Sequence, residues 1–342
     1  MKTLTDWFNA INEHDLHPSQ LIQQLAQQLN ISDSPLYRTG LRIGYEADKG
    51  SKEVASYHNY IHTSEAMASM YEMASIEFKD IPPQEVERLG LSRKEELVFL
   101  AVTVMAAHDL YHDGKDKAVT NPSKELEAQS ARAATAIAFQ EGVSRPIIDT
   151  LQRAIEATIV DPDLNDMTHT DYHANRHDAV AAISQMATES DLAASISPTW
   201  GPTKGELLAH EVEKAGNTGL AAGLRSFNGR KFFLEHICEI HSVSGKELGL
   251  EEARQQQVKA MEKVQQSLSP TLCQLQDQMF KLQQAKDLSS PEMKELQVKL
   301  RQDIQLEIKN IQSEHGTPSM LKQVESTIST IGHHNDGSLA MS

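Results

Sequence analysis

The sequence of 342 residues has only two cysteines, Cys238 and Cys273, and no Cys-x-x-Cys pair. This usage fits a reducing compartment and predicts no disulfide framework. Aromatic residues make up only 5% of the chain, and runs in which Val, Ile or Thr alternate with polar residues are nearly absent. Because such runs mark β-strands, a sheet protein is not expected.

Positive charge is also scarce, since 32 Lys and Arg face 48 Asp and Glu, a formal net charge of −16. An acidic chain repels phosphate-rich partners, so we expect no nucleic acid polymer as ligand. A small anionic substrate would need local positive charge, which metal ions can supply.

Long apolar runs are missing too, because no stretch reaches eighteen apolar residues. The N-terminal MKTLTDWFNAINEHD also lacks the apolar core of a signal peptide. The sequence therefore predicts a cytoplasmic protein without a transmembrane segment. Export through a non-classical C-terminal signal stays open.

Ala, Leu, Gln and Glu are abundant, and apolar residues recur at helical spacing, which predicts an all-α protein. We expect a helical bundle over residues 1–250, which contains the motifs described below. Residues 251–315 combine Gln, Lys and Glu with spaced apolar residues and predict a helical hairpin or coiled-coil arm, through which a homodimer could form. Residues 316–342 are polar and predicted to be disordered.

Residues 57–114 carry the most informative motifs. They open with YHNYIH, where His58 and His62 stand four residues apart, on one face if the stretch is helical. They close with AAHDLYHDG, in which His108 and Asp109 are adjacent. Imidazole and carboxylate are ordinary ligands of divalent metals, and a carboxylate has a second oxygen to bridge to a second ion. The stretch therefore predicts a metal site.

The apolar run LVFLAVTVMAA predicts a buried helix over residues 95–109. Two polar side chains at its end need partners, which a metal would provide. Asp191 lies on the apolar face of a helix predicted over residues 178–194, following Ile183 and Ala187 at four-residue spacing. On pattern alone, a metal ligand and a buried structural hydrogen bond are equally good interpretations of Asp191.

Other polar residues are more ambiguous. His169, His173 and His177 recur every four residues, but in a polar, Asp-rich stretch, where solvated surface histidines are the better interpretation. For Glu127, spacing alone favours a solvated helix glutamate.

In these motifs the chain resembles the HD superfamily of metal-dependent phosphohydrolases, and within it the catalytic domain of class I cyclic-nucleotide phosphodiesterases. The family pattern Y-H-N-x-x-H, followed by H-D-x-x-H-x-G, matches residues 57–62 and 108–114. The resemblance covers about residues 40–195 and implies a helical bundle of the HD type. Weaker likenesses are Leu126-Glu127, Ala157-Thr158 and Ser190-Asp191-Leu192.

The resemblance also implies roles for individual residues. His62, His108, Asp109 and Asp191 would hold a first metal, zinc or iron. Asp109 would bridge to a second ion, magnesium or manganese. His58 would be the general acid that protonates the leaving oxygen.

Further residues would support the reaction. By resemblance, His112 and Glu127 would orient metal-bound water and His58, and Thr158 would hydrogen-bond such a water. Candidate substrate contacts are Tyr57, Asn59, Thr158 and Gln257.

The chain departs from the family where the substrate would be recognised. Asp113 replaces a proline, and no Gln occurs between Met186 and Arg254 to hold a base edge. Gln257 is the later residue that resembles this glutamine, with Ala260 where a stacking Phe would stand. The resemblance thus supports phosphodiester chemistry better than a cyclic purine nucleotide substrate.

The sequence therefore predicts a metal-dependent phosphoric ester hydrolase, a two-metal phosphodiesterase acting on a cyclic nucleotide or another small phosphodiester. A metal-bridging hydroxide would attack phosphorus in line, with His58 as the acid.

Three alternatives stay open. A nucleotidase or nucleotide pyrophosphohydrolase of the same superfamily would keep the metals and change the leaving group. A di-iron oxygenase would need further histidines soon after the His-Asp pair, but none occurs between His112 and His169. A non-enzymatic scaffold would bind partners through its arm and carry a relic metal site.

Overall fold

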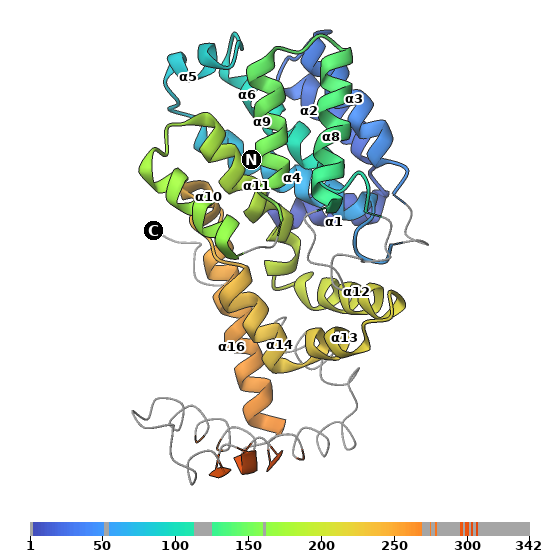
Figure 1. The fold of residues 1–342 in the computed structure, drawn as a ribbon, viewed down its shortest axis with the longest axis vertical. Coiled ribbons are helices and arrows are strands. Elements are labelled where there is room, and N and C mark those ends of the chain that lie inside the picture. The colour runs from blue at the N-terminus through green and yellow to red at the C-terminus, as the bar shows by residue number, and fades with distance from the viewer. Residues whose placement is uncertain are drawn as a thin grey trace, which may run out of the picture. The chain divides into compact units, whose positions relative to one another are not determined.

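The computed structural model describes residues 3–50, 55–112, 125–159 and 162–268, with scattered residues between 274 and 306. Every regular element in these ranges is a helix (Figure 1), so the predicted all-α class is confirmed. Among the described helices, none combines the length and apolar character needed to cross a membrane.

The chain divides into two compact units, Met1–Arg254 and Gln255–Ser342. The boundary expected at residue 250 falls at the first residue of α16 (Leu250–Leu268), the helix that continues into the second unit. Beyond α16 the predicted arm is described only at scattered residues, and the predicted disordered tail lies outside the described residues.

Three helices form the centre of the first unit: α4 (Tyr60–Glu77), α6 (Lys94–Ala107) and α11 (Ala179–Ile196). Each of them packs against the other two. From Leu97 onward α6 is buried on every side, because its residues are almost all apolar. In contrast, α4 buries charged groups such as Glu65, which need partners inside the protein.

Further helices surround this centre. α8 and α9 pack side by side, and Figure 1 shows α12, α13 and α14 together at one end of the bundle. The surrounding helices are α1 (Leu4–His14), α2 (Pro18–Gln28), α3 (Pro35–Ala47), α5 (Pro83–Arg88), α8 (Glu125–Gln140), α9 (Arg145–Glu156), α10 (Pro162–Ala174), α12 (Gly201–Lys214), α13 (Thr218–Arg225), α14 (Phe227–Phe232), the π-helical turn η1 (Phe233–Ile237) and α15 (Val243–Glu247).

A buried ion pair fastens α12 to α4. The ammonium of Lys204 lies 2.6 Å from Glu65 Oε2, and both side chains are withdrawn from solvent. The other carboxylate oxygen of Glu65 accepts a hydrogen bond from the side-chain amide of Asn12 on α1 (2.8 Å). Because a charge buried without a partner is costly, this network restricts how α12 can dock.

The start of α4 differs from the sequence prediction. Asn59 caps the helix, with its side-chain oxygen accepting from the N–H of Ile61 (2.9 Å). His58 therefore precedes the helix, whereas His62 lies in its first turn. The expectation that both histidines project from one helical face is wrong, because α4 begins only after Asn59, which lies between them.

The His-Asp pair also stands at a helix end. α6 stops at Ala107, His108 is its C-cap, and Asp109 lies in the turn that follows. The helix expected over residues 178–194 corresponds to α11. Asp113, which departs from the family pattern, lies outside the described residues.

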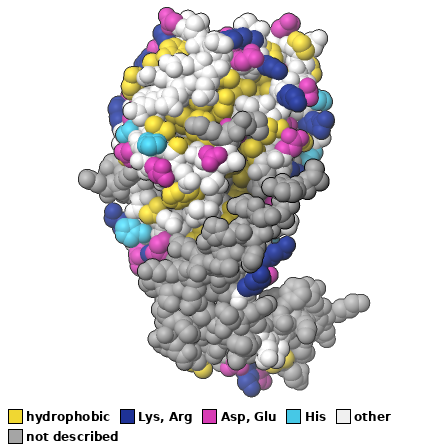
Figure 2. All heavy atoms as spheres, turned by 180° about the vertical axis from the view of Figure 1, so that it is seen from behind, with side chains coloured by type: hydrophobic (Ala, Val, Ile, Leu, Met, Phe, Trp, Pro, Cys, Tyr) yellow, Lys and Arg dark blue, Asp and Glu magenta, His cyan; other side chains and the backbone are white. Residues whose placement is uncertain are grey.

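On the face drawn in Figure 2, acidic and basic side chains of the described residues are interspersed. The Lys and Arg side chains of the described residues form no extended basic patch on this face.

Candidate metal centre

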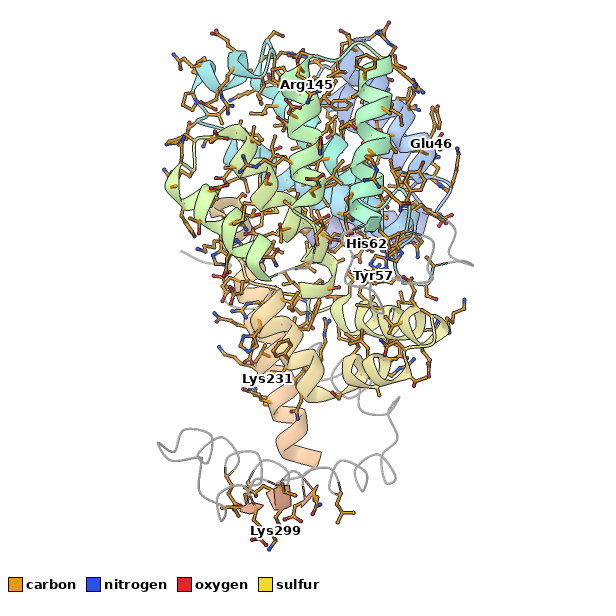
Figure 3. All side chains as sticks on the ribbon, in the orientation of Figure 1. Glu46, Tyr57, His62, Arg145, Lys231 and Lys299 are labelled. Atoms are coloured by element: carbon orange, nitrogen blue, oxygen red, sulfur yellow. The ribbon has the colours of Figure 1, made fainter. Side chains whose placement is uncertain are left out.

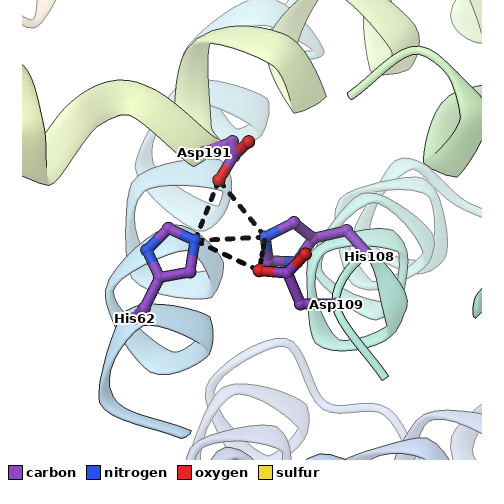
Figure 4. A group of neighbouring side chains, drawn as sticks. All are labelled: His62, His108, Asp109 and Asp191. Atoms are coloured by element: carbon purple, nitrogen blue, oxygen red, sulfur yellow. Dashed lines mark hydrogen bonds and ion pairs between the residues drawn. The ribbon is translucent and has the colours of Figure 1, made fainter. Parts of the chain in front are cut away.

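Four side chains from three helices converge at one end of the central bundle (Figure 4). His62 comes from the first turn of α4, His108 and Asp109 from the end of α6, and Asp191 from α11. Figure 3 shows His62 and Tyr57 at the end of the bundle that faces α12. One ligand atom from each of the four lies within 4.8 Å of the others, so the structure brings together the four residues predicted as ligands.

The spacing of these atoms suits one transition-metal ion. Nε2 of His62 lies 2.9 Å from Asp191 Oδ1 and 3.4 Å from Asp109 Oδ2. Nε2 of His108 lies 3.1 Å from Asp109 Oδ2, 3.3 Å from Asp191 Oδ1 and 3.4 Å from Nε2 of His62. Ligands at about 2.0–2.1 Å from a zinc ion stand about 2.8–3.4 Å apart for angles between 90° and 109°.

Hydrogen bonding supports the same fit. Nδ1 of His108 lies 2.8 Å from the carbonyl oxygen of Met105, so Nδ1 carries the proton and the Nε2 lone pair faces the cluster. Metal-ligating histidines are commonly oriented by such a bond. Asp109 Oδ2 is buried and makes no hydrogen bond within the described residues, although it lies among the imidazole nitrogens. A cation at the centre would satisfy this oxygen.

Electrostatics show that the cluster requires positive charge. Burial disfavours the charged forms, but the two aspartates outweigh it and raise the pKa of His62 and of His108. The imidazoles in turn hold the pKa of Asp109 and of Asp191 below the usual range, again against burial. Without a metal, protons on the imidazoles supply this charge, and a divalent ion would replace them.

Next to the cluster, His58 is held by a carboxylate that the sequence analysis did not single out. Nδ1 of His58 donates to Glu211 Oε1 at 2.6 Å, and Glu211 is almost wholly buried on α12. The other oxygen, Oε2, accepts from the backbone N–H of Tyr57 (2.7 Å) and of His58 (3.1 Å). Three hydrogen bonds to Glu211, one from Tyr57 and two from His58, therefore fix this segment relative to α12.

These contacts separate the protonation states of two stacked histidines. Burial alone would lower the pKa of His58, but the bond to Glu211 outweighs it and raises the pKa to about 9. The ring of His112 stacks on His58 with centroids 3.7 Å apart. Burial and the charge of His58 lower the pKa of His112 to about 4. At neutral pH, His58 is thus a cation beside a neutral His112.

Glu211 reaches this position because α12 is anchored at several points. Lys204, on the same helix, pairs with Glu65 of α4, and Nδ1 of His210 lies 2.8 Å from the hydroxyl of Ser56. In sequence, Glu211 stands in the polar segment HEVEK and resembles a solvated glutamate. The sequence holds no signal that distinguishes Glu211, because the burial of Lys204, two helical turns earlier on the same helix, is itself a product of the tertiary structure.

The predicted substrate contacts near the cluster have structural partners of their own. The hydroxyl of Tyr57 lies 3.0 Å from Ser195 Oγ, and its buried ring lies against His62. Asn59 serves as the cap of α4 and also lines a neighbouring cavity. The prediction that Tyr57 and Asn59 contact the substrate stays a prediction.

The remaining predicted residues are Thr158, Glu127 and Gln257. The hydroxyl of Thr158 donates to the carbonyl of Ile155 (2.8 Å), and among the described residues no hydrogen bond joins it to the four ligands. Burial and the charges of Asp109 and Asp191 raise the pKa of Glu127, so its carboxyl group lies within electrostatic reach of the cluster. Its predicted action on His58 stays a prediction, as does Gln257, which belongs to the second unit.

A cavity of about 460 Å³ adjoins the site. His58, Asp109 and His112 form part of its wall, and Arg42 and Lys49 also line it. The cavity therefore offers ligating, acidic and basic groups to one small molecule.

Comparison of the sequence with models of known protein families and with curated proteins finds no match in either.

Proposed function

We propose that this chain is a metal-dependent phosphohydrolase of the HD type that cleaves a small phosphodiester. The observation that carries the proposal is the pair formed by His58 and Glu211, held beside the four-residue cluster. A cluster alone would serve a structural metal equally well. A protonated imidazole next to it, bonded to a carboxylate, adds the proton donor that ester cleavage needs.

The chemistry of the ligands supports binding of a divalent ion, and the second oxygen of Asp109 could bridge to another. Such ions would lower the pKa of a coordinated water and neutralise the oxygens of a phosphoryl group. His62 and His108 suit zinc or iron, whereas a second ion held largely by water and one carboxylate suits magnesium or manganese.

His58 is suited to donate a proton to the leaving oxygen. Its Nδ1 is taken by Glu211, which leaves Nε2 for a substrate, and a pKa of about 9 keeps it protonated at neutral pH. Glu211 stabilises the protonated imidazole of His58 and fixes the orientation of its ring. A positioned acid contributes about 10²–10⁴-fold to such reactions.

The cavity supports the substrate class. Its volume of about 460 Å³ lies within the range typical of small-molecule sites, roughly 300–1,000 Å³. Arg42 and Lys49 in its lining could attract the charge of a phosphoester, although each already pairs with a nearby glutamate. The lining of the cavity indicates no preference for a particular nucleobase.

The proposal can be tested by hydrolysis with metal-reconstituted protein. The panel holds cyclic AMP, cyclic GMP, bis-p-nitrophenyl phosphate, nucleoside monophosphates and guanosine tetraphosphate. The variants are His58→Ala and Asp109→Ala, and His177→Ala, an exposed histidine outside the cluster, is the control. We expect diester cleavage that Asp109→Ala abolishes and that His58→Ala lowers by about 10²–10⁴-fold with metal content unchanged.

Other outcomes would redirect the proposal. Turnover of monoesters or pyrophosphates alone would favour a nucleotidase or pyrophosphohydrolase. Loss of bound metal in His58→Ala would show that His58 is a ligand instead of an acid, as its grouping with His112 and Glu211 allows. No turnover at full metal occupancy would contradict hydrolysis and favour a scaffold.

A further inference from the structure

Another group of metal-ligating side chains lies outside the site described above. His169 on α10 stacks on His241, in the segment between η1 and α15, with ring centroids 3.7 Å apart. Oε2 of Glu239 lies 3.2 Å from Nε2 of His241. One ligand atom from each of the three residues lies within 4.8 Å of the other two. This group shares no residue with the proposed catalytic centre.

The sequence predicted that His169, His173 and His177 are solvated. His173 and His177 are exposed, but His169 is partly buried, so the prediction is wrong for His169. Its partner, His241, is distant in sequence, and four-residue spacing along α10 does not reveal it.

The tautomer of His169 is set in the way that metal sites require. Nδ1 of His169 lies 2.6 Å from Oε1 of Gln185. A side-chain amide oxygen only accepts, so Nδ1 carries the proton and Nε2 keeps its lone pair. The amide nitrogen of Gln185 donates to Glu189 (2.8 Å), and both of these α11 residues are fully buried.

Glu189 also holds the other half of the group. Its Oε1 accepts hydrogen bonds from the backbone N–H of His241 (2.7 Å) and of Ser242 (2.8 Å). One buried network on α11 thus orients both His169 and the backbone at His241. Outer hydrogen bonds of this kind fix the ligands of metal sites and tune their affinity.

We infer that His169, Glu239 and His241 form a second metal site, which binds Zn²⁺ and joins α10 to the segment that leads into α15. Two imidazoles and one carboxylate suit zinc better than calcium or magnesium, which prefer oxygen ligands. His173 stands one turn further along α10, with its ring centroid 5.7 Å from that of His241, and is placed to complete the coordination.

The role of this site is structural. Three protein ligands come from two segments that also meet at Tyr172, whose hydroxyl accepts from the N–H of Val243 (3.1 Å). A bound ion adds a further connection at this junction. It stabilises the native state because the unfolded chain lacks the preformed ligand set.

The test uses full-length protein stripped of metal, in a background of His62→Ala and Asp191→Ala that removes the first site. Co²⁺ is added as a spectroscopic probe and Zn²⁺ as the competitor. We expect one equivalent of Co²⁺ with absorption of a low-symmetry site, displaced by Zn²⁺. His241→Ala and Glu239→Gln abolish it, and Gln185→Leu weakens Zn²⁺ binding by about 10–100-fold. His177→Ala is the matched control.

Zinc content provides a second measurement that does not need the background variant. Wild-type protein loaded with Zn²⁺ should hold one equivalent of zinc more than His241→Ala. Zn²⁺ should also raise the melting temperature of the wild type more than that of the variant. Equal zinc content in wild type, His241→Ala and the control would overturn the inference. So would a Co²⁺ spectrum that persists in Glu239→Gln and His241→Ala.

Discussion

Glu211 Oε1 lies 2.6 Å from Nδ1 of His58, although 153 residues separate them in sequence. This bond sets the charge of His58 and the orientation of its ring. It also connects the segment before α4 to α12, so the proposed proton donor depends on how α12 docks. Substitution of Glu211 should therefore change both the pH dependence and the stability of the protein.

Glu211→Gln should move the alkaline limb of the activity profile. The acid works only when protonated, so kcat/KM of the wild type should fall as pH rises through about 9, the pKa of His58. Without the carboxylate, burial lowers the pKa of His58, so the alkaline limb should shift to lower pH. The measurement is kcat/KM against pH, with Glu213→Gln, an exposed glutamate on the same helix, as control. An unmoved limb would show that His58 is not the acid.

The same pair should make stability depend on pH. The pKa of His58 is raised from 6.5 to about 9, so its contribution is complete below pH 6.5 and lost as pH rises through 9. The pKa of Glu211 is lowered from 4.5 to about 2 against burial by its bond to His58, so its contribution is complete above pH 4.5 and lost as pH falls through 2.

Metal-free wild type and Glu211→Gln should thus differ most in unfolding free energy between pH 4.5 and 6.5. The difference should shrink toward pH 10. Urea unfolding at pH 6 and pH 10 measures it. A difference that does not change with pH would mean that the pair contributes packing rather than charge.

Lys204→Met should destabilise the protein by about 3–5 kcal/mol, because it leaves the Glu65 carboxylate buried without its cation. The double variant Glu65→Leu with Lys204→Met should recover much of this loss, since both charges are then removed. Denaturant unfolding measures both, and Lys246→Met, at an exposed position, is the control. If the double variant is less stable than Lys204→Met, packing rather than the buried charge accounts for the effect.

Asp191→Asn should weaken the stabilisation of the protein by zinc. Zinc at 100 times its dissociation constant stabilises a one-site protein by about 2.7 kcal/mol, which raises the melting temperature. The variant loses an anionic ligand, so the rise should be much smaller, whereas the exposed Asp149→Asn should behave as the wild type. The experiment is thermal unfolding with and without Zn²⁺ in a background of His241→Ala. The same rise in Asp191→Asn would exclude Asp191 as a ligand.

The sequence by itself determined the helical class and the residue types of the first cluster. Helical periodicity is a local property. The burial of α6 can be predicted from the sequence because its residues are apolar on every side. His108 and Asp109 are adjacent, so their pairing needs no knowledge of the fold. Asp191 was visible as a carboxylate on an apolar face.

Only the tertiary structure decided which residues complete these groups. Glu211 meets His58 because α12 docks on α4 through Lys204, and no local pattern specifies that docking. His169 meets His241 because buried side chains of α11 hold both, across a long stretch of chain. Such contacts depend on long-range packing and on the need of buried charges for partners. The spacing of residues along a single helix predicts neither of these.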